Sequence, residues 1–284
     1  MHYFSLKVKA VDNHFSSIPK SSIKKCSREL NIPTSTIHVC LKKKLKFKPY
    51  RYTKVQTLSD THKQKRKQAC DWFIEQGPAF PKNVIFSDEK WFVLKPTPNR
   101  KNNVHWAKTN PHIVTEVGDQ GTKKCMVWMG ILNGEILPIT WFVGKGVNGE
   151  NYLEMLRDKV WPAISDHPNL RDIYFMQDGA RPHTTDDVLS FLKEKFHNRV
   201  ISDKLDLFWP PKSPDLNLCD TFLWPYLEQL VFQENPSSVE ELKEVVDRFA
   251  KEIPKDMLLR ATDNFFKRVL ACAEEDGGHF ETKM

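Results

Sequence analysis

The sequence predicts a mixed α/β domain preceded by a small all-α segment. Apolar runs on either side of Asn133-Gly134 indicate an antiparallel hairpin, because Asn-Gly between such runs is the strongest short hairpin signal. Strand and helix patterns then alternate, which is typical of a domain that mixes both kinds of element in one core. Residues 1–70 carry a net charge of +14 and the other 214 residues carry −7, so the two parts are expected to have different roles.

The basic segment has the pattern of a helix-turn-helix over residues 21–48. A serine start signal and apolar residues at near-helical spacing predict a first helix that ends near Leu30. Asn31-Ile32-Pro33 then breaks the helix, and Thr34 or Ser35 can cap a second one. Two short helices with a three-residue break fit the motif whose second helix enters the major groove of DNA. An ordinary helical hairpin is the alternative, and the positive charge favours DNA binding.

The expected DNA contacts lie on the second helix and just beyond it. Base edges would be contacted by Ser35, Thr36 and His38, and phosphates by Lys42, Lys43, Lys44 and Arg51. Residues 1–20, ahead of the first helix, are expected to be irregular. Residues 49–82 are expected to form a basic linker and a helix that docks on the next domain.

Composition argues against a membrane protein and against a zinc-finger protein. No apolar run is long enough to span a bilayer, so no membrane partner is expected. The six cysteines are scattered without a Cys-x-x-Cys pair, which suits apolar thiols in a reducing compartment.

The α/β domain is expected over residues 83–284. Strands are predicted where β-branched and aromatic residues cluster between turn signals, and helices where apolar residues recur every three or four positions. The predicted strands are residues 84–87, 90–94, 124–132, 136–143, 172–177 and 200–208. The predicted helices are residues 149–164, 185–196, 220–232 and two more over 239–273, separated by Pro254. This order of elements resembles the RNase H-like nuclease fold.

Three aspartates occupy matching settings in this domain. Asp88 ends the first predicted strand at a tight turn, Asp178 ends the strand 172–177, and Asp220 opens a helical pattern. Carboxylates at strand ends point into the mouth of a sheet, where two or three that converge can hold a pair of Mg²⁺ ions. Such a pair supports in-line attack at phosphodiesters. Glu89 is expected on the opposite side of the strand, in a surface salt bridge.

Three residues close to these acids have alternative roles. Asp215 competes with Asp220 as the third acid, but its extended turn favours an Asx-type hydrogen bond that fixes the loop. His183 is expected either to contact the scissile phosphate or to stabilise the loop of Asp178. Arg181 is expected to contact the DNA backbone or to form an ion pair with a neighbouring acid.

Three blocks around these acids resemble the signature blocks of mariner-superfamily transposases. They are Phe86-Ser87-Asp88-Glu89-Lys90, Gln177-Asp178-Gly179-Ala180-Arg181-Pro182-His183 and Ser213-Pro214-Asp215-Leu216-Asn217-Leu218-Cys219-Asp220, in the family's order. The closing segment, residues 274–281, resembles a mariner C-terminus. The resemblance runs from about residue 21 to the end of the chain.

The resemblance implies a cut-and-paste DNA transposase with an RNase H-like catalytic domain. Carried over residue by residue, Asp88, Asp178 and Asp220 match the catalytic acids and would hold two Mg²⁺ or Mn²⁺ ions. The implied partners are double-stranded DNA, at the element's terminal inverted repeats and at TA target sites, and a second copy of the chain in a homodimer. The implied compartment is the nucleus.

The N-terminus differs from the family pattern. The family usually carries two helix-turn-helix units and only one is expected here, so the chain is interpreted as N-terminally shortened. The alternative function is therefore a non-transposing, sequence-specific DNA-binding protein, either a relic or a domesticated copy. An RNA-cleaving RNase H is disfavoured, because a basic helix-turn-helix reads duplex DNA.

Overall fold

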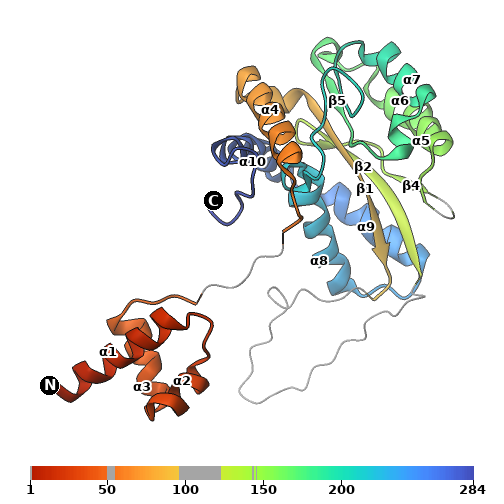
Figure 1. The fold of residues 1–284 in the computed structure, drawn as a ribbon. Helices are drawn as coiled ribbons and strands as arrows, with labels where there is room; N and C mark the ends of the chain where they lie inside the picture. The colour runs from red at the N-terminus through yellow and green to blue at the C-terminus, as the bar shows by residue number, and fades with distance from the viewer. Residues whose placement is uncertain (1, 50–54, 96–122, 143, 145) are drawn as a thin grey trace. The chain divides into compact units, whose positions relative to one another are not determined.

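The computed structural model describes residues 2–49, 55–95, 123–142, 144 and 146–284. The chain divides into two compact units, Met1–Lys54 and Val55–Met284 (Figure 1). In the described part of the chain, no helix is long and apolar enough to cross a membrane.

The first unit is a bundle of short helices. They are α1 (His2–Ser17), α2 (Ile23–Leu30) and α3 (Thr34–Val39), and α3 continues into the π-helical turn η1 (Cys40–Lys44). The α2 helix begins where predicted, because the Ser22 hydroxyl accepts a hydrogen bond from the Lys25 amide at 3.1 Å. It ends at Asn31, whose φ of 50° is left-handed. The cap position of α3 is occupied by Pro33 rather than by Thr34 or Ser35, with no side-chain cap bond.

The prediction that residues 1–20 are irregular is wrong. They contain α1, and its Val11 and Phe15 side chains are buried against Cys26 of α2 and Ile37 of α3. The two helices predicted from residues 21–48 have too little apolar surface to form a core alone, and α1 supplies the missing face. The unit is therefore a three-helix core that includes the predicted helix-turn-helix.

The second unit is built on one mixed six-stranded sheet. Its strands are β1 (Val84–Val93), β2 (Lys124–Leu132), β3 (Glu135–Ile136), β4 (Thr140–Phe142), β5 (Tyr174–Met176) and β6 (Val200–Ile201). The order is β3-β2-β1-β5-β6, with β4 also paired to β2. Strands β1 to β4 pair antiparallel, whereas β1–β5 and β5–β6 pair parallel. The predicted turn at Asn133-Gly134 is present, and both residues have positive φ.

Helices pack on both faces of this sheet (Figure 1). One face contacts α4 (Asp60–Gln76), η7 (Cys219–Leu223), α8 (Trp224–Glu234), α9 (Val239–Glu252) and α10 (Lys255–Glu274). The other face contacts α5 (Gly149–Met155), η3 (Leu156–Val160), α6 (Trp161–Ile164) and α7 (Asp186–Phe196). Short 3₁₀ turns complete the unit at Phe80–Asn83, Leu170–Asp172, Arg181–Thr184 and Pro214–Leu216. The predicted mixed α/β class is confirmed.

Four predicted strands differ from the structure. Residues 84–87 and 90–94 are not separated by a turn, since β1 runs through Asp88 without a break. The strand predicted over 136–143 is divided into β3 and β4 around Pro138, which has no amide to donate to a ladder. Only residues 200–201 of the strand predicted over 200–208 pair with a neighbour. The alternating apolar residues over 202–208 are the reason a strand is predicted there. Within the described part of the chain no neighbouring strand pairs with them, so they form a loop.

Candidate active site

The three aspartates reach one edge of the sheet from three different elements. Asp88 lies inside β1, but the parallel partner β5 pairs with β1 only as far as Phe86↔Met176. Asp178 follows the end of β5 by two residues, so both carboxylates emerge where the parallel pair ends. Asp220 lies on η7, and Asn217 ties this segment to β1 by donating to the Ser87 carbonyl at 3.3 Å.

A cavity of about 460 Å³ brings these acids together. Its wall includes Asp88, Asp178 and Asp220, and a fourth carboxylate, Asp203, that the sequence patterns did not single out. Asp203 follows β6 by two residues, as Asp178 follows the neighbouring parallel strand β5. That equivalence of position is the signal that could have found it, because carboxyl ends of parallel strands meet at one edge.

Trp224 fixes the orientation of Asp88. Its indole Nε1 donates to Asp88 Oδ2 at 2.7 Å, and the ring is almost fully buried. Trp224 begins α8, one helical turn after Asp220, so the same helical segment carries the third acid and holds the first. Burial and the charge of Asp220 raise the pKa of Asp88 to about 8, although the indole bond lowers it.

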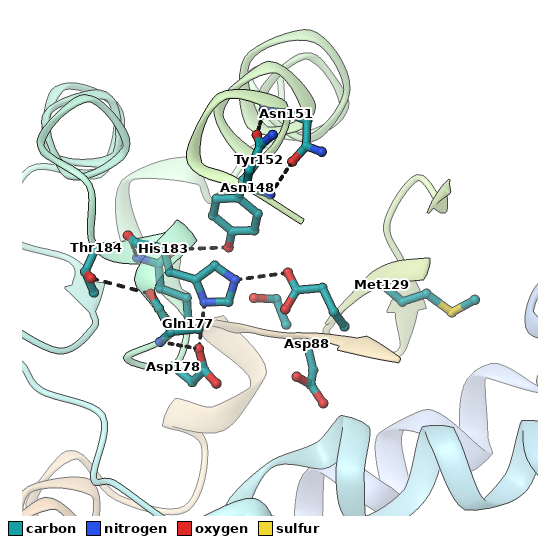
Figure 2. Close-up of polar contacts among 12 residues, drawn as sticks. Asp88, Met129, Asn148, Asn151, Tyr152, Gln177, Asp178, His183 and Thr184 are labelled. Atoms are coloured by element: carbon teal, nitrogen blue, oxygen red, sulfur yellow. Dashed lines mark hydrogen bonds and ion pairs between the residues drawn. The ribbon is translucent and has the colours of Figure 1, made fainter. Parts of the chain in front are cut away.

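His183 binds Asp178 and lies on the side of β1 to which Glu89 points. Its Nδ1 lies 2.6 Å from Asp178 Oδ1 (Figure 2). Its Nε2 lies 3.2 Å from Glu89 Oε1 in an ion pair without hydrogen-bond geometry. Burial lowers the pKa of His183, but the two carboxylates outweigh it and raise that pKa to about 10. His183 is therefore a cation at neutral pH. Burial acts to raise the pKa of Asp178, but the bond from His183 outweighs it and lowers that pKa.

A buried polar network supports this histidine. The Tyr152 ring lies 4.3 Å from the imidazole, and its hydroxyl donates to Gln177 Oε1 at 3.0 Å (Figure 2). Gln177 Nε2 in turn donates to the His183 carbonyl at 2.8 Å and to Ser202 at 2.9 Å. The bond to Asp178 agrees with one of the two roles expected of His183, and a contact with the scissile phosphate stays a prediction.

The surface salt bridge predicted for Glu89 is wrong. Its side chain is only 11% exposed, and its partner is the buried His183. Glu89 does point away from Asp88, as alternation along a strand requires, but the opposite face is covered by α5.

Asp220 interacts electrostatically with both other acids. Burial raises the pKa of Asp220 to about 6, with Lys90 lowering it and the charges of Asp178 and Asp215 adding to the rise. Asp220 is also the carboxylate whose charge raises the pKa of Asp88 most. Asp220 lines one cavity with Asp88 and Asp178, and its role as the third acid stays a prediction.

Asp215 has a different partner from the one predicted. Its carboxylate accepts two bonds of 2.7 Å from the guanidinium of Arg66, on α4, instead of an Asx-type bond within its own loop. Arg66 is fully buried, and it also donates to Ser213 Oγ at 2.9 Å and to the Gly277 carbonyl at 2.8 Å. This cluster joins the third-acid loop, residues 213–220, to α4 and to the turn at Gly277 near the C-terminus.

Most of the predicted DNA contacts belong to the first unit, whereas Arg181 belongs to the second. In the first unit Ser35, His38 and Lys42, Lys43 and Lys44 are exposed, and Thr36 is half-buried. Arg51 falls outside the described residues. Arg181 is exposed and, among the residues described, forms no ion pair, so its predicted DNA contact stays a prediction.

The cavity has the donor chemistry of a Mg²⁺ site. Mg²⁺ is usually held by one or two carboxylates, with water or substrate phosphates completing its shell. The mutual repulsion of Asp88 and Asp220 would be relieved by a divalent cation between them. Across the described ranges, no group of three or more His, Cys, Asp or Glu side chains could hold a metal ion together. A Mg²⁺ ion bound here would therefore be held by fewer than three of these side chains, with water or substrate oxygens completing its shell.

Comparisons with known proteins identify the fold. No protein-family model and no curated protein matches the chain. Among solved structures, the Mos1 transposase paired-end complex with left transposon end has a TM-score of 0.77 at 18% identity, covering 96% of this chain and 79% of that chain. The chain has the fold of a mariner transposase. A pre-cleavage Mos1 transpososome also matches with a TM-score of 0.77 at 18% identity, covering 95% of this chain and 78% of that one.

The catalytic domain of Mos1 mariner transposase matches by itself. Its TM-score is 0.63 at 19% identity, covering 80% of this chain and 100% of that one. The mariner transposase fold supports the resemblance carried by the three sequence blocks, and the acids of those blocks line the cavity described above.

Proposed function

We propose that this chain is a metal-dependent DNA transposase of the cut-and-paste type. The observation that carries the proposal is the convergence of Asp88, Asp178 and Asp220, from three distant segments, on one cavity in a mariner transposase fold. Mos1 paired-end complexes are known with Mn and with Mg, which supports a divalent ion here. Two ions per site, terminal inverted repeats and TA sites as DNA partners, a homodimer and a nuclear location complete the proposal.

The residues of the site divide the work between them. Asp88, Asp178 and Asp220 would hold the ions, which when bound activate the attacking oxygen and stabilise the departing one. Trp224 donates to Asp88 Oδ2 and His183 binds Asp178 Oδ1, so each of these carboxylates is oriented by a buried side chain. Preorganised carboxylates need less reorganisation when substrate arrives.

Nicking of supercoiled plasmid by the purified full chain tests this function. We expect nicked product with Mg²⁺ or Mn²⁺ and none with EDTA, because the acids alone repel phosphates. Binding of duplex DNA is measured in parallel in EDTA. No nicking by a folded chain that still binds duplex DNA would contradict the transposase and favour the second candidate, a DNA-binding protein without transposition. That candidate is favoured by the exposed lysines of the first unit, which forms its own core.

A further inference from the structure

Two lysines line the cavity together with the acids. Lys65 comes from α4, and Lys212 comes from the loop that follows Pro210 and Pro211. Neither forms an ion pair with any carboxylate within the described part of the chain, although four aspartates line the same cavity. Lys212 Nζ instead donates to the Thr57 carbonyl at 3.0 Å.

Lys65 differs from every other cation around it on α4. Lys63 pairs with Asp60 at 3.4 Å, and Lys67 pairs with Asp71 at 2.7 Å. Arg66 is bound to Asp215. Lys65 is exposed and has no partner in the residues that the structure describes. Among the described residues, Lys65 is thus the cation of this run without an ion-pair partner, and it is the one that lines the cavity.

Lys212 is held in an unfavourable backbone conformation. Its φ of 52° is left-handed, a region that residues other than Gly, Asn and Asp rarely adopt. The buried Arg66 donates to the Lys212 carbonyl at 3.3 Å, and two preceding prolines restrict the loop. The Lys212 backbone is thereby fixed at the wall of the cavity.

We propose that Lys65 and Lys212 bind the backbone phosphates that flank the scissile bond. This inference rests on the proposed function, and it adds contacts in the second unit to those predicted for the first. The divalent ions held by the acids would bind the scissile phosphate. The neighbouring phosphates of the same strand then need other cations. Lysine supplies a point charge without base preference, so these contacts position the strand and do not read its sequence.

Lysine footprinting tests the inference without requiring cleavage. The full chain is treated with an amine-acetylating reagent, with and without duplex DNA in MgCl₂, and acetylation is quantified by mass spectrometry. We expect DNA to protect Lys65 and Lys212 several-fold and to leave Lys63 unchanged. Equal acetylation of Lys65 with and without DNA, or equal protection of Lys65 and Lys63, would overturn the proposal.

Kinetics of matched variants provide the second readout. Lys65→Ala should raise the KM for plasmid about tenfold and reduce the salt slope of binding by about 1, because one phosphate contact is lost. Lys63→Ala removes the same charge two residues away and should stay within twofold of the wild type. Identical effects of the two variants would refute the inference. A wild-type chain that does not nick, with Lys65 still protected by DNA, refutes the proposed function and not the phosphate contacts.

Discussion

Asp220→Asn is expected to lower metal-dependent nicking by about 10³-fold, with duplex binding and folding unchanged. Loss of one carboxylate weakens an ion whose stabilisation of the transition state is worth several kcal/mol, and about 4 kcal/mol corresponds to that factor. Asp220 is chosen for this test because its charge raises the pKa of Asp88, and the charge of Asp178 raises the pKa of Asp220. The initial rate of plasmid nicking at saturating Mn²⁺ measures the effect.

Two other aspartates make this result specific. Asp206→Asn is the matched control, because Asp206 is exposed and does not line the cavity, and its nicking rate should equal that of the wild type. Asp203 is the competitor for the role of third acid. If Asp203→Asn abolished nicking and Asp220→Asn did not, the third ligand would be the acid that follows β6 rather than the one on η7.

Arg66→Met should lower the free energy of unfolding of the second unit by about 3–5 kcal/mol. Removing one partner of a buried ion pair leaves the other uncompensated, and Asp215 is only 14% exposed. The Gly277 carbonyl also loses its bond from Arg66. Urea unfolding followed by far-UV circular dichroism measures the change.

Controls separate this role from a general effect of charge. Lys67→Met breaks the exposed pair with Asp71 on the same helix and should have little effect on unfolding. The double variant Arg66→Met, Asp215→Leu should recover part of the loss, because no unpaired charge then remains buried. A single Arg66→Met variant as stable as the wild type would show that the cluster does not hold the third-acid loop.

Local patterns predicted most elements of the second unit. Asn133-Gly134 carries its own turn geometry, and the long helices have apolar spacing that needs no distant information. The predictions that were wrong depend on partners elsewhere in the chain. A break at Asp88 is natural for an isolated segment, but pairing with β2 continues through Asp88↔Met129 and keeps the strand extended.

The aspartates of the site could be predicted and the side chains that hold them could not. A local rule accounts for Asp178, which follows the end of a parallel strand, whereas Asp88 lies within β1 and Asp220 lies on η7. The bonds from Trp224 to Asp88 and from Arg66 to Asp215 join residues more than 130 positions apart. Periodicity says that such a side chain is buried, but not which partner it meets. Glu89 was placed on the correct side of its strand and in the wrong environment for the same reason.

Anomalous scattering from crystals of the full chain soaked in MnCl₂ tests the central claim most directly. The claim is that Asp88, Asp178 and Asp220 form a divalent-metal site in one cavity. It predicts at least one manganese peak within about 2.0–2.3 Å of oxygens from two of these carboxylates. Saturating Mn²⁺ with no peak among the three acids, or with manganese bound only elsewhere on the chain, would contradict it.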